Sequence, residues 1–204
     1  DVNATALENA RAGIAATGVK CLARTCDVAS EESVAGFARA VHEAVGPVDV
    51  LVNNAGVAFL GSFEQTPLSE WRRIYDINVL GIVHCIRAFL PAMRAAGGER
   101  KIVNVASLAG FAPAPNMSAY AASKHAVVGL SEVLAMELTG TDISVLVVCP
   151  CIINTAIVHV SPTASGMSEA QIRKLQKYYA DQGCHPSVVA ADVVRSVEND
   201  DTFL

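Results

Sequence analysis

Charged and aromatic residues are scarce in this sequence of 204 residues, at 17% and 5%, with a single Trp. Basic residues are also in the minority, because 15 Lys and Arg face 20 Asp and Glu, which gives a net charge of −5. A nucleic-acid-binding surface needs clustered positive charge, and a membrane-surface segment needs a run of Lys or Arg. We therefore expect neither nucleic acid nor a membrane among the partners.

Long apolar runs are missing too, although the mean hydropathy is +0.38. The longest uncharged stretch, 143–168, contains Pro150 and then turns polar, so its apolar part is too short to cross a bilayer. It predicts a buried strand that runs into a loop. At this length, and with 52% hydrophobic residues, we expect one compact domain over 1–204.

Cysteine patterns typical of zinc sites are absent. None of the cysteines forms a CxxC pair, and no Cys/His set has zinc-ligand spacing. We expect no metal, and we expect buried free thiols in a reducing, cytoplasmic compartment. The six cysteines are Cys21, Cys26, Cys85, Cys149, Cys151 and Cys184.

Two hydrophobic periods alternate along the chain. Continuous apolar runs predict strands at 19–28, 48–56, 101–107 and 142–150, and 202–204 begins another. Helical patterns lie at 30–45, 66–97, 118–140, 168–179 and 185–200. Strands buried on both faces predict an α/β fold with a parallel sheet between two helical layers, a Rossmann-like doubly wound α/β/α arrangement. We expect 155–183 to form a lid over the substrate within this domain.

Ser30 is expected to cap the helix at 30–45, ahead of two Glu residues. Thr66 and Pro67 are expected to open the long helix at 66–97, with Thr as the cap and Pro at the first helical position.

Polar residues and prolines follow the predicted strands, at Asp27, Asn54, Ser107 and Pro150. In parallel sheets ligands bind at the carboxyl ends of the strands, so these residues are expected to line one edge.

Tyr120 and Lys124 lie one turn apart on the helix after Ser107, and they share its face. Bringing a Tyr pKa from about 10 to near 7 takes roughly 4 kcal/mol. A cation at about 4 Å supplies that much. The pattern predicts that Tyr120 is an acid/base whose pKa Lys124 lowers, and that Ser107 binds the substrate oxygen.

The sequence resembles the short-chain dehydrogenases/reductases (SDR), in their shorter, non-extended branch. The resemblance rests on "NNAG" (53–56), on Asn78 in "YDINVLG", on Ser107 in "NVAS" with Tyr120 and Lys124, and on "PCIINT" (150–155). It covers essentially the whole chain. Two features depart from the family pattern: Cys151 replaces a Gly, and the glycine-rich TGxxxGxG loop is absent. We therefore expect the chain to lack the first βαβ unit of the fold.

The resemblance implies an NAD(P)-dependent oxidoreductase that interconverts an apolar secondary alcohol and a ketone. It implies a catalytic set of Asn78, which holds a water, Ser107, Tyr120 and Lys124. It implies that the cofactor is held by Asp1, Asp27, Val28, Asn54, Ala55, Gly56, Tyr120, Lys124, Pro150, Ile153 and Thr155. An acidic residue at Asp1 favours NAD over NADP, because it accepts hydrogen bonds from the ribose hydroxyls.

The substrate is expected to meet Ser107, Leu108 and Cys151 under the lid. The pocket border is expected to include Phe111, Pro113, Pro115 and Met117; alternatively, these residues only pack the lid. The resemblance implies a homodimer or a homotetramer.

Other interpretations stay open. One is a catalytically weak SDR-like protein that binds a dinucleotide or a partner, and another is an extended-type epimerase or dehydratase. Residues 54–56 are alternatively a plain strand-end turn, Asn78 a helix-interior polar residue, Asp1 a terminal carboxylate and Thr155 a simple loop residue.

Overall fold

The sheet at the centre of the fold has three parallel strands in the order β1-β2-β3. The structure is a computed structural model that describes residues 1–155, 157, 161–164 and 168–204. The strands are β1 (Val50–Asn53), β2 (Arg100–Val105) and β3 (Ile143–Val148). Residues 202–204 lie alongside β3, where the Leu204 N–H donates to the Val147 carbonyl at 2.9 Å. The expected strand start at 202–204 is therefore confirmed.

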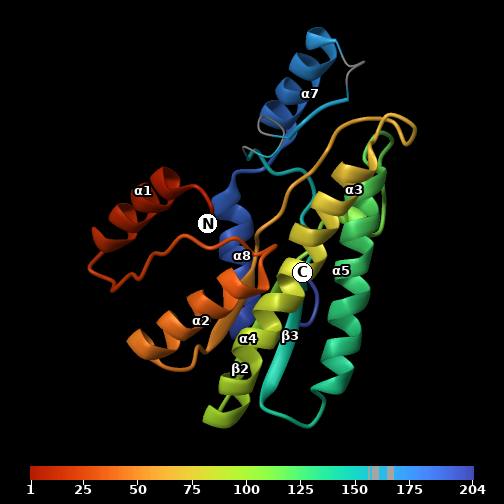
Figure 1. The fold of residues 1–204 in the computed structure, drawn as a ribbon. Helices are drawn as coiled ribbons and strands as arrows, with labels where there is room; N and C mark the ends of the chain where they lie inside the picture. Colours follow the sequence, from red (N-terminus) through yellow and green to blue (C-terminus); the bar gives the residue numbers. More distant parts are fainter. Residues whose placement is uncertain (156, 158–160, 165–167) are drawn as a thin grey trace.

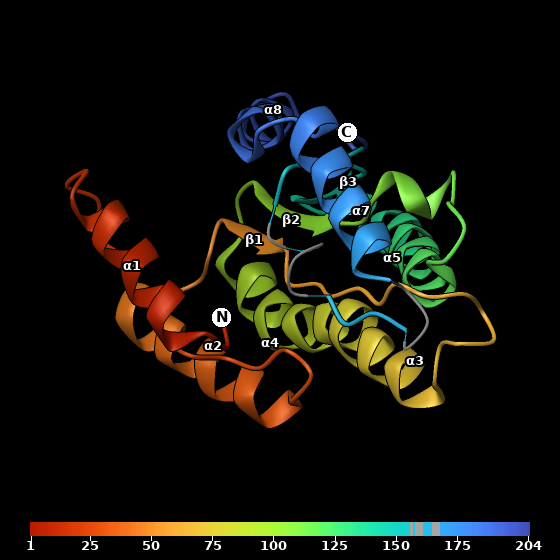
Figure 2. The same ribbon diagram turned by 90° about the horizontal axis from the view of Figure 1, so that it is seen from above.

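Helices flank this sheet on both sides (Figures 1 and 2). One core cluster packs helix residues such as Phe89 and Val127 against Ile102, Val145 and Val147 of the sheet. The opposite face, with Val103, Leu146 and Val148, packs against the last helix. The predicted three-layer α/β/α architecture is confirmed. The described helices are α1 (Ala4–Ala15), α2 (Glu31–Val45), α3 (Leu68–Tyr75), the π-helical η1 (Asp76–Leu80), α4 (Gly81–Ala96), the short 3-10 turn η2 (Leu108–Gly110), α5 (Ser118–Glu137), α7 (Glu169–Gln182) and α8 (Pro186–Glu198).

Local sequence signals explain several helix ends. The Ser30 hydroxyl accepts a hydrogen bond from the Ser33 N–H at 3.2 Å and caps α2, as predicted. Ser168 and Gln171 cap α7 reciprocally, which satisfies two backbone donors at its start. Each cap lies within about two residues of the position that the sequence predicts.

The long helix predicted at 66–97 is continuous from Leu68 to Ala96, but it has a π-helical turn in its middle, at Asp76–Leu80. Its start also differs from the prediction. Pro67 is the N-cap residue, and the Thr66 hydroxyl donates to the Ser62 carbonyl at 2.8 Å instead of capping the helix. Thr66 is thus used by the preceding loop.

By length and composition alone, this helix is apolar enough to cross a membrane, with a mean hydropathy of 1.4 in its most apolar window. Core helices of soluble proteins meet the same criterion. In this fold it packs against the sheet and α5. The absence of a membrane partner stays a prediction.

The strand predicted at 19–28 is not formed, because the structure gives these residues no strand hydrogen bonds. A single backbone hydrogen bond, from the Cys26 N–H to the Asp1 carbonyl at 3.2 Å, joins this described segment to the start of the chain. An apolar extended segment becomes a strand only beside a partner, and among the described residues β1 has just one neighbour, β2. Sequence reasoning also missed α1, which has no buried residue and is capped by Asn3.

Burial on both faces is confirmed for β2 and β3 but is wrong for β1. Val50 and Val52 are 41% and 51% exposed, because α8 covers β2 and β3 and does not reach β1. The six cysteines are free, as predicted, but only Cys26 is buried, and Cys151 and Cys184 are exposed. Both exposed thiols lie in the segment that follows β3, outside the packed layers.

Candidate active site

Asn78 ties the loop after β1 to the long helix. Its amide Oδ1 accepts from the Val57 N–H at 2.8 Å, and its Nδ2 donates to the Val57 carbonyl at 3.0 Å. The side chain is fully buried, and it sits in the π-helical turn. Asn78 therefore takes the place of a strand partner for Val57, directly after the "NNAG" segment.

The same amide reaches the Tyr120 helix through Ser123. Asn78 Nδ2 donates to Ser123 Oγ at 3.0 Å, and Ser123 Oγ donates to the Tyr120 carbonyl at 2.7 Å. Ser123 is fully buried. The predicted pair of Asn78 and Tyr120 is thus joined by a residue that sequence reasoning missed. A Ser inside an apolar helix, three residues after a Tyr, is too common a pattern to mark a role.

Lys124 is buried, with only 4% of its surface exposed. Its Nζ donates to the Val105 carbonyl at 2.8 Å and lies 5.7 Å from the centroid of the Tyr120 ring. Burial lowers the pKa of Lys124 to about 8, because desolvation penalises its charged form. One of its three ammonium protons is used by Val105, so two remain available to other acceptors.

Burial of Tyr120 raises the pKa of its phenol above the ordinary value, with the Ser107 side chain opposing this rise and Tyr179 adding to it. In the protein alone the pKa of Tyr120 is therefore raised and not lowered as expected, because desolvation of the phenolate is the largest effect. The part of Lys124 in lowering this pKa stays a prediction. The Lys124 ammonium is instead held by Val105 at the end of β2.

Ser107 lies where β2 and β3 end side by side. The Ala106 N–H donates to the Val148 carbonyl and the Leu108 N–H to the Pro150 carbonyl, both at 2.8 Å. The Ser107 hydroxyl accepts from the Ala109 N–H at 3.2 Å, which starts the turn η2. Ser107, Tyr120 and Lys124 are therefore brought to one edge, as predicted.

Gly110 fixes η2 against α5. A Cβ atom there would lie 3.0 Å from the Lys124 carbonyl oxygen, so only glycine allows this approach. The backbone that follows Ser107 is thereby held on the helix that carries Tyr120 and Lys124.

Gly56 lies against two of these groups. A Cβ atom on it would lie 3.5 Å from Asn78 Oδ1 and 3.6 Å from Lys124 Nζ. Asn54, Ala55 and Gly56 are themselves exposed. The backbone of the "NNAG" segment is thus accessible to a ligand, with Lys124 next to it.

A second part of the edge lies near Asp27 and Val28. A Cβ atom on Gly81 would meet Val28 Cγ2 at 2.8 Å, and His84 Nδ1 lies 2.8 Å from the Val28 carbonyl oxygen. These contacts hold the segment against the start of α4. An open hollow of about 430 Å³ adjoins it and is lined by Asp27, Ala29, Ser69, Arg72, Arg73, Asp76 and Ile77.

Asp1 is joined to the residue before Asp27, since its carbonyl accepts from the Cys26 N–H at 3.2 Å. Its carboxylate is exposed and accepts from the Asn3 N–H at 2.8 Å. The backbone of Asp1 is thus joined to the residue before Asp27. The parts of Asp1 and Asp27 in holding the cofactor, and that of Asp1 in NAD preference, stay predictions.

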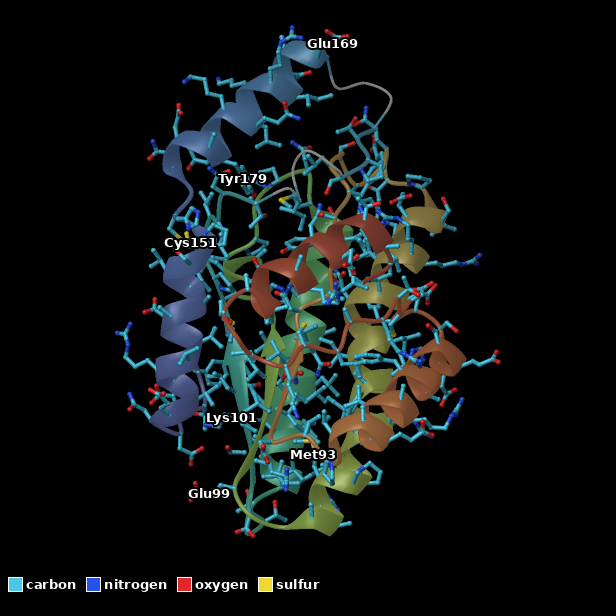
Figure 3. All side chains as sticks on the ribbon, turned by 90° about the vertical axis from the view of Figure 1, so that its left-hand side faces the viewer. Met93, Glu99, Lys101, Cys151, Glu169 and Tyr179 are labelled. Atoms are coloured by element: carbon cyan, nitrogen blue, oxygen red, sulfur yellow. The ribbon has the colours of Figure 1, made fainter. Side chains whose placement is uncertain are left out.

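The segment after β3 carries Cys151, Ile153 and Thr155, which are respectively exposed, half-buried and half-buried. Figure 3 shows Cys151 and Tyr179 at the end of the molecule opposite Glu99 and Lys101, which lie where β2 begins. Part of the predicted lid at 155–183 (156, 158–160 and 165–167) lies outside the described residues.

The substrate-wall predictions fare unevenly. Leu108 is 41% exposed beside Ser107, consistent with a wall position. Phe111 instead packs near Phe203, with ring centroids 6.3 Å apart. Pro113 and Pro115 are exposed, and Met117 is half-buried and pairs with Gly61.

The residues present fit a nicotinamide dinucleotide. The fit rests on the exposed backbone of Gly56 next to Asn78 and Lys124, and on the two ammonium protons of Lys124 for which the described residues show no acceptor. Among the described residues, no group of three or more His, Cys, Asp or Glu side chains gathers as a metal site. That no metal takes part stays a prediction.

Comparisons with known proteins agree with this geometry. A family model described as "short chain dehydrogenase" matches residues 1–165. An uncharacterized oxidoreductase, YusZ of Bacillus subtilis, is 40% identical over 131 residues, 64% of this chain and 46% of that protein. D-beta-hydroxybutyrate dehydrogenase of Rhizobium meliloti is 36% identical over 132 residues, 65% of this chain and 51% of that protein. The chain thus matches about half the length of these curated relatives.

A solved structure shares the fold over the whole chain. It is a short chain dehydrogenase/reductase from Burkholderia phymatum in complex with NAD, and it has a TM-score of 0.91 and 30% identity. The match covers 100% of this chain and 76% of that one. With the family model matching most of its residues, the chain belongs to the short-chain dehydrogenase family of oxidoreductases.

Proposed function

We propose that the protein is a nicotinamide-dinucleotide-dependent dehydrogenase or reductase that interconverts an apolar secondary alcohol and a ketone. The observation that carries this proposal is the buried Lys124, whose ammonium lies beside both the Tyr120 ring and the bare backbone of Gly56. In a member of the short-chain dehydrogenase family, this arrangement of Lys124, Tyr120 and Gly56 supports oxidation or reduction at a CH–OH carbon. When bound, the nicotinamide supplies the hydride acceptor or donor for that carbon.

In this proposal Tyr120 moves the proton. Its phenol gives a proton to the substrate oxygen during ketone reduction and takes one during alcohol oxidation. Ser107, at the end of β2, holds the substrate oxygen beside the phenol by hydrogen bonding. Because burial raises the pKa of Tyr120, the phenol form needed for reduction is favoured in the protein alone.

Lys124 has two tasks in the proposal. Once a substrate and a dinucleotide are bound, its cation would stabilise the Tyr120 phenolate during oxidation, because the buried ammonium lies 5.7 Å from the centroid of the Tyr120 ring. Its remaining N–H groups would hold the ribose hydroxyls of the dinucleotide. Asn78 keeps the Val57 backbone in place, and we propose that it also holds a water that returns protons to Lys124.

NAD is proposed over NADP. The Asp1 backbone is hydrogen-bonded to Cys26, next to Asp27 in the chain. The Asp1 carboxylate would repel a 2′-phosphate, and neither Val2 nor Asn3 offers a cation to receive one. A cytoplasmic location, a homodimer or homotetramer, and a small-molecule substrate complete the proposal.

The test is a panel of secondary alcohols with NAD and with NADP, following the absorbance of the reduced nicotinamide. Turnover that is faster with NAD supports the proposal, and equal or better kcat/KM with NADP contradicts the cofactor assignment. Tight dinucleotide binding without turnover of any alcohol or ketone would favour the alternative, a catalytically weak binding protein.

A further inference from the structure

The hydroxyl of Ser123 connects Tyr120 to the loop after β1. It donates to the Tyr120 carbonyl at 2.7 Å and accepts from Asn78 Nδ2 at 3.0 Å. The same Nδ2 donates to the Val57 carbonyl at 3.0 Å, and Asn78 Oδ1 accepts from the Val57 N–H at 2.8 Å. A continuous chain of hydrogen bonds therefore joins the backbone of Tyr120 to that of Val57, and it passes through two side chains that are fully buried.

Helix formation does not explain a serine at this position of α5. The residues at 119, 121 and 122 are alanines, the best helix formers. A serine that bonds back to a carbonyl of the preceding turn slightly destabilises a helix and bends it. A buried hydroxyl without such a bond would cost still more. Ser123 is thus explained by the two groups that its hydroxyl joins.

Both amide protons of Asn78 are used in this arrangement. An amide nitrogen carries two protons, and those of Asn78 go to the Val57 carbonyl and to Ser123 Oγ. Without the hydroxyl, one proton of this buried amide would lose its acceptor, which is costly. The amide would then turn, or the first turn of α5 would move. Either change alters the distance between the loop after β1 and Tyr120.

We propose that Ser123 is a positioning residue, which fixes the turn of α5 that carries Tyr120 relative to the loop at 54–57. The exposed backbone at 54–56 is the part of this loop at which we propose that the dinucleotide binds. Ser123 would then set the place of the proton-transferring phenol relative to the nicotinamide, so that both reach the same substrate carbonyl group. The reaction rests on the proposed function, whereas the placement of Tyr120 by Ser123 does not.

Ser131, about two turns further along α5, provides a matched control. Its hydroxyl donates to the Val127 carbonyl at 2.7 Å and accepts from Asn104 Nδ2 at 2.9 Å. Ser131 is also fully buried. This second link runs to β2, away from the turn that carries Tyr120. Ser131→Ala therefore removes an equivalent pair of hydrogen bonds from the same helix without releasing that turn.

Steady-state kinetics of the purified full chain, with the secondary alcohol that it oxidises best, separate positioning from general loosening. Ser123→Ala should lower kcat about tenfold, because small misplacements of reacting groups are costly. It should leave KM and the dissociation constant of NADH within about twofold. Ser131→Ala should keep all three values within about twofold of the parent. A kcat of Ser123→Ala within twofold of the parent, or an equal fall of kcat in both variants, overturns the proposal.

Ser123→Cys is the second variant, and it serves if the alanine variant does not fold. The thiol fills the space of the hydroxyl but is only a weak donor and acceptor. The fall of kcat should therefore be similar to that of Ser123→Ala. Activity equal to that of the parent would show that the hydroxyl is not needed and would overturn the role of Ser123.

The ring of Tyr120 reports its own placement if no alcohol or ketone is turned over, in which case the proposed function fails. The chain has four tyrosines, and with ¹³C-labelled tyrosine rings the Tyr120 signal is assigned by its loss in Tyr120→Phe. Ser123→Ala should shift or broaden this NMR signal, and Ser131→Ala should leave it in place. An unmoved signal in Ser123→Ala, or the same change in both variants, shows that Ser123 does not position the phenol.

Discussion

Lys124 is a cation kept almost out of contact with water at the edge of the sheet. Burial of an ammonium group costs free energy unless it is paired, and here the described partner is one backbone carbonyl, that of Val105. A fold that tolerates this cost retains a residue that binds and stabilises negative charge. At the residue scale, we therefore expect Lys124 to make the free energy of unfolding depend on pH.

The sign of that pH dependence can be stated. The folded pKa of Lys124, about 8, is lower than the ordinary lysine pKa of 10.5, so the unfolded chain binds more protons between these values. The contribution of Lys124 to stability therefore rises from pH 8 to pH 10.5. Lys124→Met should lose this dependence, and the parent should gain up to about 3 kcal/mol relative to the variant across the window.

Urea unfolding at pH 7 and pH 10 measures this difference. The exposed Lys174→Met is the matched control, and it should follow the parent at both values. A difference between Lys124→Met and the parent that is the same at pH 7 and pH 10 would show that the lysine is not desolvated.

Tyr120→Phe tests the chemistry at the same scale. The variant should keep its fold and its dinucleotide affinity, because Phe fills the space of the ring and Lys124 stays bound to Val105. Turnover should fall by at least about 10²-fold, the usual contribution of a proton-transferring side chain. Steady-state kinetics and a fluorescence titration with NADH measure the two effects. Activity within tenfold of the parent contradicts the proposed mechanism.

Replacement of Cys151 tests the pocket. The thiol is exposed next to Pro150, where the family pattern has Gly, and Cys151 is not among the residues with positive φ. The backbone of Cys151 is therefore unstrained. We expect its thiol to narrow the proposed substrate pocket. Cys151→Gly should raise the size of the ketone that is accepted and change KM, with Tyr120 chemistry intact. A tenfold gain in NAD affinity with an unchanged substrate range would instead point to relief of strain.

The sequence predicts the reactive side chains of the candidate site better than it predicts the residues that hold them in position. Tyr120, Lys124 and Ser107 follow from spacing and strand ends, because reactive side chains are rare types at restricted positions. Ser123 does not, since its importance arises only when folding brings it to Asn78. The raised pKa of Tyr120 was also unpredictable, because desolvation depends on packing that no local pattern encodes.

At the scale of elements, the contact between α4 and residues 27–28 fixes one end of the sheet edge that we propose binds the dinucleotide. Gly81 allows Val28 to approach the helix, and His84 lies against the Val28 carbonyl. Sequence patterns predict each element separately; this contact depends on how they pack. For the same reason the pattern at 19–28 was read as a strand, although hydrogen bonding to a neighbour decides that state.

Gly81→Ala measures the importance of this contact. The added methyl would lie 2.8 Å from Val28 Cγ2, so the segment must shift, and dinucleotide affinity should fall severalfold. Gly129→Ala is the matched control, because nothing lies within 4 Å of its Cβ position on α5. That control should gain about 0.5–1 kcal/mol in stability through helix propensity. Isothermal titration with NAD decides the matter, and equal affinities in both variants would contradict the role of the contact.

At the scale of the whole molecule, apolar side chains remain uncovered on the two long helices. Leu80, Val133 and Met136 are 44%, 52% and 72% exposed, and only 28% of the most apolar window of the helix 68–96 is buried. Exposed apolar surface of this kind marks interaction sites, and two-fold symmetric contacts between copies are the commonest way to cover it.

We therefore expect Met136→Glu to weaken self-association. Light scattering at micromolar concentration should show a dimer or tetramer for the parent and a smaller species for the variant, because a charge in an apolar contact is costly. Val194→Glu, on α8 and 57% exposed, is the control and should leave the mass unchanged. A parent that is monomeric at this concentration refutes the expectation.

The π-helical turn at Asp76–Leu80 changes the direction in which the side chains of the long helix point. One extra residue turns everything beyond it by about 100° around the axis, so the apolar stripes before and after the turn need not align. Ile74 before it packs with Phe59 and Ala119, whereas Ile82 and Phe89 after it pack on the main core. Deletion of one residue within 76–80 would therefore leave a regular α-helix. Such a helix could pack either Ile74 against Phe59 and Ala119 or Ile82 and Phe89 against the main core, but not both at once.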